Sequence, residues 1–315
     1  MPSKFFITTF FWNQTTMTLS CYHNVKRTQT NTRPPCPTKY INAMFVGDRS
    51  GSMCNMGSVP QEGVSQFMSK YRDMAKQFPD SIIKVTVVTF DSVSETSYNG
   101  YAHEITQEDI NYAYESMLPR GTTKLFDTAV ESIIEQQVQI EDYKKQFESM
   151  PYEVRNLGPQ ITSSFTLLTD GEDNESTTFT KNNLKEFIQE HIELCNTTCL
   201  FAAANQDAMI SGANYGFSKN NTLQIGGDIE EARAAFRSCT NASMRSATQQ
   251  SADYTQAERE ASCCFHENML DNNGDYDNYG YDTYDANDAN DANDANDTNS
   301  FDDYEMCMPP LPTRY

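Results

Sequence analysis

The sequence predicts an α/β protein with a doubly wound, mostly parallel sheet, an antiparallel edge strand and helices on both faces. Short apolar or β-branched segments alternate with segments of helical periodicity from Lys39 onward. Strands that alternate with helices imply a parallel sheet covered on both sides. Two of the expected strands end abruptly on an acid, Asp48 and Asp170. Ligands of such sheets bind at the carboxyl ends of the strands, so these two acids indicate the functional edge.

The expected strands are the most apolar and β-branched stretches of the chain. The first ends at Asp48 after four apolar residues, and the segment 82–90 is β-branched and largely apolar. The segment 93–98 alternates less cleanly, which favours a short antiparallel strand at the edge of the sheet. Three further strands are expected at 164–169, 198–203 and 222–225.

Segments of helical periodicity separate these strands. Apolar residues recur at helical spacing from Val64 to Phe78, and Pro79 stops that helix. Thr106 precedes two acids, which is typical of a helix start, and this helix is expected to end near Met117. The segment 151–159 is expected to be irregular. The remaining helices are expected at 125–147, 182–194, 208–217 and 229–248.

Composition divides the chain into three parts. Residues 1–38 form an N-terminal arm or linker, and 39–250 form the α/β domain. Residues 251–315 form an acidic, Asp- and Asn-rich tail of low complexity, in which Asp-Ala-Asn recurs four times over 285–296. No Lys or Arg occurs over 271–305, and nothing in this stretch can bury a core. The tail is therefore expected to be disordered.

Charge and cysteine usage exclude several classes of function. The formal net charge of −21 argues against nucleic acid or an anionic membrane as a partner. No stretch approaches the roughly 20 apolar residues of a membrane span, so no membrane insertion is expected. The nine cysteines are scattered without zinc-type spacing, which favours free thiols and a cytoplasmic location. The aromatic-rich segment 5–12 lacks a signal-peptide cleavage site, so secretion is not expected. The Asn- and Asp-rich tail is compatible with a large virus, in which case the location is the host cytoplasm or the virion.

Oxygen-bearing side chains are expected to converge where the winding of the sheet reverses. An Asp-x-Ser-x-Ser motif follows the first strand, and Gly51 permits a sharp turn within it. The alternative for this motif alone is a helix N-cap whose serines bond the backbone. Carboxylate and hydroxyl oxygens suit a hard cation such as Mg²⁺ or Mn²⁺. The predicted metal ligands are Asp48, Ser50, Ser52, Thr122 and Asp170.

Three blocks, in this order, resemble the von Willebrand factor type A (vWA) domain with an intact metal-ion-dependent adhesion site (MIDAS). The blocks are Asp48-x-Ser50-x-Ser52, Gly121-Thr122-Thr123-x-Leu125-x-Asp127 and Leu168-Thr169-Asp170-Gly171. Cytosolic phage and bacterial members of the family are the most similar. The blocks that resemble theirs are Arg120-Gly121-Thr122-Thr123-x-Leu125-x-Asp127-x-Ala129, Thr169-Asp170-Gly171-Glu172-Asp173-Asn174-x-Ser176 and Ala204-Asn205-Gln206-Asp207-Ala208. The resemblance covers about 39–247 and implies a Rossmann-like fold.

The resemblance also implies how a cation would be held. The hydroxyls of Ser50, Ser52 and Thr122 would touch it directly, and Asp48 and Asp170 would bind directly or through water. With neutral hydroxyls around it, the cation keeps most of its charge and leaves one position open. The exposed Asp or Glu of a partner protein can fill that position. The implied function is a non-enzymatic, metal-dependent protein-binding module, in assembly or scaffolding.

Two other functions stay open at this stage. One is a Mg²⁺-dependent phosphohydrolase, because acids at strand ends around Mg²⁺ also serve phosphoryl transfer. Against it, the position two residues after Asp48 is Ser50 and not a second acid, no Walker loop occurs, and only Arg49 and Arg120 could hold a phosphate. The other is a structural protein whose metal stiffens the loops.

Residues beside the predicted ligands have weaker expectations. Asp127 is expected to cap or brace its own helix rather than to hold the metal. For Glu172 and Asp173 the default expectation is solvated loop acids, and the alternative is that they tune the rim of the site. Asn205 and Asp207 follow a strand that should end beside the site. They are expected either to support the site or contact the partner, or simply to form a turn.

Overall fold

The computed structural model of the chain describes residues 39–204 and 208–263. The expectations for the N-terminal arm, for Asn205 and Asp207, and for the acidic tail beyond residue 263 lie outside the described residues.

The sheet has six strands in the order β3-β2-β1-β4-β5-β6. Every neighbouring pair is parallel except β2 and β3, which are antiparallel at the edge. The winding reverses between β1 and β4, as expected, and the predicted fold class is confirmed. The strands are β1 (Lys39–Asp48), β2 (Ser81–Phe90), β3 (Ser94–Tyr101), β4 (Gln160–Thr169), β5 (Thr197–Ala203) and β6 (Thr222–Gln224).

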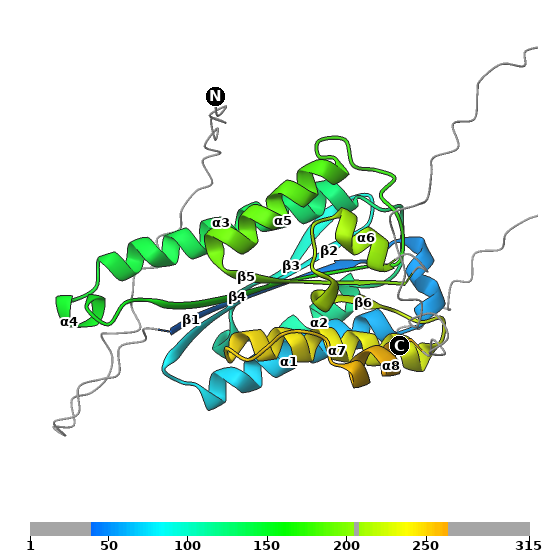
Figure 1. Cartoon of the computed structure of the whole chain (residues 1–315). Helices are drawn as coiled ribbons and strands as arrows, with labels where there is room; N and C mark the ends of the chain where they lie inside the picture. Colours follow the sequence, from blue (N-terminus) through cyan, green and yellow to red (C-terminus); the bar gives the residue numbers. More distant parts are fainter. Residues whose placement is uncertain (1–38, 205–207, 264–315) are drawn as a thin grey trace, which may run out of the picture. The chain divides into compact units, whose positions relative to one another are not determined.

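Helices cover both faces of the sheet (Figure 1). One face is covered by α3 (Leu125–Glu148), α5 (Lys181–Cys195) and α6 (Ala208–Asn214). The other face is covered by α1 (Val59–Gln77), α2 (Gln107–Ser116) and α7 (Ile229–Ala247), and α8 (Gln256–Ser262) packs beside α7. The short helices are α4 (Tyr152–Arg155), η2 (Gly51–Met56), η3 (Ala102–Glu104) and η4 (Lys219–Asn221). None of the helices in the described ranges combines the length and apolar character that a membrane span requires.

The hydrophobic core lies in two layers, one on each side of the sheet. Successive residues of a strand point to opposite faces, so Met44 packs under α3 and α5 whereas Phe45 packs on Phe67 of α1. Both sides of β1 are buried over almost its whole length. This burial explains why residues 43–46 of the strand are continuously apolar rather than alternating.

The structure corrects the expected ends of the folded region. The first helix begins at Val59, before Val64, where the apolar pattern starts. Pro60 does not fit that pattern, but a proline is well tolerated in the first turn of a helix. The tail was expected to begin at 251, yet α8 follows, with a capping box between Thr255 and Glu258. Tyr254 just before α8 is buried. The segment up to 263 therefore packs on the domain.

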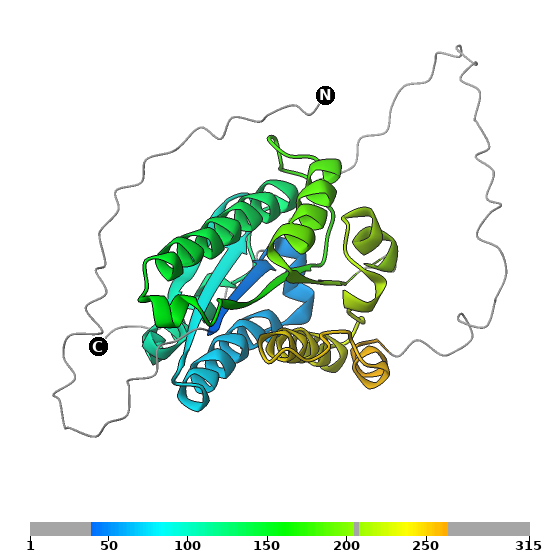
Figure 2. The same ribbon diagram turned by 60° about the vertical axis from the view of Figure 1, so that its left-hand side comes forward.

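Helices α1 and α7 lie side by side (Figure 2). Their close approach depends on Gly63 of α1. A Cβ atom at this position would lie 2.2 Å from Cδ1 of the buried Phe236. Overpacking of this kind costs about 1–3 kcal/mol, whereas replacing a helical glycine by alanine contributes up to about 1 kcal/mol of stability.

We therefore expect Gly63→Ala to lower the free energy of unfolding, measured by urea titration. Gly227→Ala is the matched control, because a Cβ atom there meets nothing within 4 Å. A more stable Gly63→Ala variant would contradict the close approach of the two helices.

A buried polar group links α3 and α5 to the sheet. Gln136 Nε2 of α3 donates to Asn42 Oδ1 at 3.1 Å and to the Ser164 carbonyl at 3.0 Å. The Gln136 amide oxygen must then accept, so His191 donates to it from Nε2 at 2.8 Å. The buried Nδ1 of His191 has no hydrogen-bond partner within the described residues, which favours the neutral ring. Burial lowers the pKa of His191 from 6.5 to about 4.

This histidine predicts a loss of stability in mild acid. The unfolded chain takes up a proton at His191 near pH 6.5, whereas the folded chain resists it until about pH 4. The contribution is complete above pH 6.5 and is lost as the pH falls to about 4, with a total of about 3 kcal/mol. Urea unfolding at several pH values measures it. The His191→Gln variant should lose stability less steeply across this window, and equal slopes would contradict the prediction.

Candidate metal centre

Three acids lie at the carboxyl ends of three neighbouring strands, at the same edge of the sheet. Asp48 is the last residue of β1, Asp170 follows β4, and Asp91 follows β2. The parallel register places Asp48 opposite Phe90, the last residue of β2. Because carboxyl ends of parallel strands share one edge, the fold brings these side chains to one rim.

Four of the five predicted ligands form one hydrogen-bonded group. The Ser50 amide donates to Asp48 Oδ1 at 2.7 Å, and the hydroxyls of Ser50 and Ser52 lie 3.0 Å apart. Ser52 Oγ donates to Asp170 Oδ1 at 2.8 Å, and Ser50 Oγ approaches the same oxygen at 3.4 Å. The motif after β1 and the acid after β4 therefore meet at one point.

The helix N-cap alternative for this motif does not hold. Ser50 does precede the first residue of η2, but its side chain makes no capping hydrogen bond to that helix. Its hydroxyl instead points to Ser52 and Asp170. Both serine hydroxyls are thus turned toward the carboxylates at the strand ends.

The two carboxylates of this group lie in a poorly solvated place. Asp48 is fully buried, and its second oxygen accepts from Thr169 Oγ1 at 2.7 Å. Burial raises the pKa of Asp48 to about 6, although hydrogen bonds from Thr169 and Ser50 oppose the shift. Desolvation also raises the pKa of Asp170. Two desolvated carboxylates beside two hydroxyls favour a nearby cation, so the donor set fits a hard divalent ion.

Thr122 lies on the loop next to the serines, but its own side chain is exposed. The Gly51 amide donates to the Gly121 carbonyl at 3.1 Å, which fixes the two loops beside each other. Gly121 has a φ of +67°, a conformation that favours glycine, and it packs against Asp91. Thr122 shares no hydrogen bond with the other four predicted ligands within the described residues.

The loop after Asp170 is fastened to the start of α3. Asp127 was expected to brace its own helix, but its carboxylate accepts from the amides of Thr177, Thr178 and Phe179, at 3.1, 3.0 and 2.7 Å. Burial would raise the pKa of Asp127, but these three N–H donors hold it below its ordinary value. Asp127 therefore braces the neighbouring loop.

Asp173 was expected to be a solvated loop acid and is not one. Its carboxylate accepts from the Phe126 amide at 3.1 Å, in the first turn of α3. That turn leaves amides without partners inside the helix, and the residue before it supplies no side-chain cap. Asn174 Oδ1 accepts from the Thr123 amide at 2.8 Å, in the loop just before α3.

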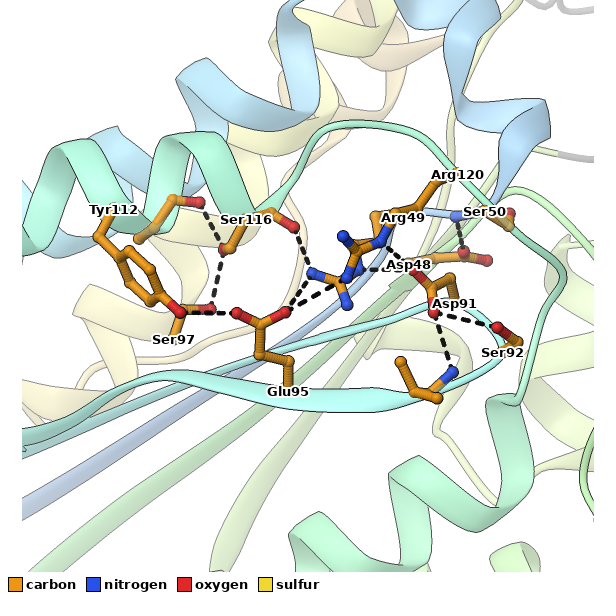
Figure 3. A network of polar contacts seen from close by, with 12 residues as sticks. Asp48, Arg49, Ser50, Asp91, Ser92, Glu95, Ser97, Tyr112, Ser116 and Arg120 are labelled. Carbon is orange, nitrogen blue, oxygen red and sulfur yellow. Dashed lines mark hydrogen bonds and ion pairs between the residues drawn. The ribbon is translucent and has the colours of Figure 1, made fainter.

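Sequence reasoning missed Asp91, the third acid at a strand end. Its Oδ2 accepts from Arg49 Nε at 3.0 Å and from Arg120 Nε at 2.7 Å (Figure 3). The signal was present, since an acid directly after a buried strand is the pattern that identified Asp48 and Asp170. Both arginines that were considered for a phosphate are therefore paired with a carboxylate.

The donor set differs from the usual clusters of charged ligands. Within 39–204 and 208–263, no group of three or more His, Cys, Asp or Glu side chains is placed to hold a metal ion. The candidate centre consists of two carboxylates and serine hydroxyls, with Thr122 beside them.

Comparisons with known proteins found similarity to solved structures only. No protein-family model matches the chain, and no curated protein sequence matches it. A von Willebrand factor type A protein from Catenulispora acidiphila matches with 17% identity over 65% of this chain and 43% of its own, at a TM-score of 0.39. Proximal thread matrix protein 1 from the mussel byssus, solved with a zinc-occupied MIDAS motif, matches with 16% identity over 66% of this chain and 46% of its own, at a TM-score of 0.41.

A third similar structure is the pilus adhesin SpaC from Lactobacillus rhamnosus GG. It matches with 14% identity over 70% of this chain and 31% of its own, at a TM-score of 0.41. The chain spans less than half the length of these three proteins. At these values the comparisons add nothing to the site, which rests on the geometry given above.

Proposed function

We propose that this chain is a non-enzymatic, divalent-metal-dependent protein-binding module of the vWA type. Its cation, Mg²⁺ or Mn²⁺, would be held at a MIDAS-like centre and would accept an acidic side chain of a partner protein. The observation that supports this most is the contact of Ser50 and Ser52 with Asp170, 118 to 120 residues later in the chain. The proposed metal residues are Asp48, Ser50, Ser52, Thr122 and Asp170.

The chemistry of the donor set favours binding over turnover. Serine and threonine hydroxyls are neutral, so a cation held by them keeps much of its positive charge and attracts a carboxylate. Bound there, the cation would supply a Lewis-acidic position for the partner's Asp or Glu. Asp48 and Asp170 would balance its charge from the protein side.

The arrangement gives little support to a phosphohydrolase. Such an enzyme needs a second acid beside the aspartyl nucleophile and a cation to steady the phosphate. Here a serine stands two residues after Asp48, and the Arg49 side chain is 1% exposed and engaged by Asp91. Arg120 is exposed, but it is paired with the same carboxylate.

A metal-dependent capture experiment tests the function. Immobilised full-length chain is exposed to lysate in Mg²⁺ and eluted with a chelator, and Ser50→Ala and Asp170→Ala are run beside it. We expect the wild type alone to retain proteins that the chelator releases, and we expect a phosphatase screen to be negative. Retention of the same proteins with and without Mg²⁺ would contradict the proposal. Phosphatase activity that Asp170→Ala removes would also contradict it.

Loss of a hydroxyl ligand and loss of a carboxylate should reduce metal affinity to different extents. Ser50→Ala removes one neutral donor that water can replace, so we expect a moderate fall in Mn²⁺ affinity. Asp48→Ala removes a balancing charge and should weaken binding far more. Calorimetric titration with Mn²⁺ ranks the two variants, and a larger loss in Ser50→Ala would contradict the assigned roles.

A further inference from the structure

A buried carboxylate beside the candidate centre belongs to none of the five proposed ligands. Asp91 follows β2, is 2% exposed, and uses both of its oxygens. Oδ1 accepts from the Val93 amide at 2.9 Å, which fixes the carboxylate on its own turn. Oδ2 accepts from Arg49 Nε at 3.0 Å and from Arg120 Nε at 2.7 Å.

Each arginine comes from a loop that carries proposed ligands. Arg49 lies in the serine loop, residues 48–52, and Arg120 lies in the threonine loop, residues 118–124. Arg49 stands directly before Ser50, and Arg120 stands two residues before Thr122. A single oxygen of Asp91 thus bridges the two loops (Figure 3).

Backbone hydrogen bonds also join the serine loop to the threonine loop. The Arg120 amide donates to the Arg49 carbonyl at 2.7 Å, and the Gly51 amide donates to the Gly121 carbonyl at 3.1 Å. The Asp91 carbonyl also accepts from the Lys124 amide at 2.8 Å. Asp91 therefore contacts the threonine loop through both its backbone and its side chain.

The surrounding charges are matched. Glu95 Oε2 accepts from Arg49 Nη1 at 2.8 Å and from Arg120 Nη2 at 3.4 Å, so two carboxylates face two guanidinium groups. Arg49 also donates to the Ser116 carbonyl at the end of α2. The positive charges of the two arginines are thus balanced within this cluster.

We infer that Asp91 is a positioning residue that holds the serine loop and the threonine loop together so that their hydroxyls face one cation. This inference rests on the proposed function. Asp91 does not touch the cation itself and acts through Arg49 and Arg120.

Asp91→Asn in the full chain is the main test. The substitution keeps the size of the side chain and removes its charge. We expect Mn²⁺ affinity, measured by calorimetry, to fall by about 10–100-fold, as for other residues that orient metal ligands. In metal-free protein, amide hydrogen exchange at Gly51 and Arg120 should accelerate by about tenfold or more, because both amides bridge the loops.

Two variants serve as controls. Glu95→Gln removes the same charge from the same cluster, but its amide oxygen can still accept from Arg49 and Arg120 while its NH₂ group donates to the Tyr112 hydroxyl. In Asp91→Asn the NH₂ group must instead face either the Val93 amide or the two arginines, which are all donors. Exchange at Gly51 and Arg120 should therefore stay close to wild type in Glu95→Gln.

Gly63→Ala lowers stability through the contact of α1 with Phe236 of α7, which involves none of the proposed ligands, and should leave Mn²⁺ affinity unchanged. Arg120→Met is the alternative test if Asp91→Asn does not fold. It removes the hydrogen bond from the exposed Arg120 to Asp91 and should also accelerate exchange at Gly51.

The outcomes separate this inference from the function on which it rests. Wild-type protein that binds no Mn²⁺ would refute the proposed function and the role of Asp91 with it. Normal Mn²⁺ binding by the wild type, with affinity and exchange unchanged in the Asp91 variant, would refute the role of Asp91 alone. Equal effects from Glu95→Gln would show that charge and not positioning is responsible, and would also overturn the inference.

Discussion

Arg49→Met is expected to lower the free energy of unfolding by about 3–5 kcal/mol, as for other buried ion pairs that lose one partner. The Arg49 side chain is 1% exposed, and it donates to Asp91, Glu95 and the Ser116 carbonyl. Methionine fills much of the space but pairs with none of these acceptors. Urea unfolding followed by circular dichroism measures the loss.

Arg120→Met is the matched control for this prediction. Arg120 donates to the same oxygen of Asp91, at 2.7 Å, but its side chain is 59% exposed. Exposed ion pairs contribute about 0–1 kcal/mol, so its loss should be much smaller. Similar losses of stability in the two variants would show that burial does not determine how much Arg49 contributes to the free energy of unfolding.

Asp48→Asn is expected to have two effects of opposite sign. Divalent-ion affinity should fall much further than in Ser50→Ala, because the charge that balances the cation is gone. Metal-free stability should rise at neutral pH. Burial raises the pKa of Asp48 from 3.8 to about 6, so the ionised carboxylate destabilises the fold above that value, by up to about 3 kcal/mol.

The sign follows from proton binding. Between pH 3.8 and about 6 the folded chain holds a proton at Asp48 that the unfolded chain has lost, so stability falls as the pH rises through this window. Calorimetric Mn²⁺ titration and metal-free urea unfolding at neutral pH test the two effects. Asp73→Asn on the exposed surface of α1 is the control and should change neither. A metal-free Asp48→Asn variant less stable than wild type would contradict the argument.

The sheet was predictable because each strand carries a local signal. Strands buried on both faces are continuous apolar segments, and the alternation with helices determines the parallel winding. Two helices were missed: the short α4, within the segment 151–159 that was expected to be irregular, and α8, whose polar sequence has no apolar stripe. The second of these is the longer one. It is held by Arg245 paired with Glu258 and by Arg259, which donates to three carbonyls before and within β6. Only the capping box at Thr255 marked it in the sequence.

The candidate centre was predictable only in part. Asp48, Ser50 and Ser52 are neighbours in sequence, and strand adjacency brings Asp170 to them. The partners of Asp127 and Asp173 depend on how a loop 50 residues away folds back, and no local pattern encodes that. Asp91 carried the signal of an acid at a strand end, but its two arginines meet only in the folded chain.

Anomalous diffraction from crystals soaked in Mn²⁺ tests the central claim most directly. The account predicts one strong peak at about 2.0–2.2 Å from the hydroxyl oxygens of Ser50 and Ser52. Thr122 and Asp170 should lie around the ion, with Asp48 bound to it directly or through water. The peak should be absent from Asp48→Ala crystals. A saturating soak that leaves no peak among these five residues in wild-type crystals would contradict the account.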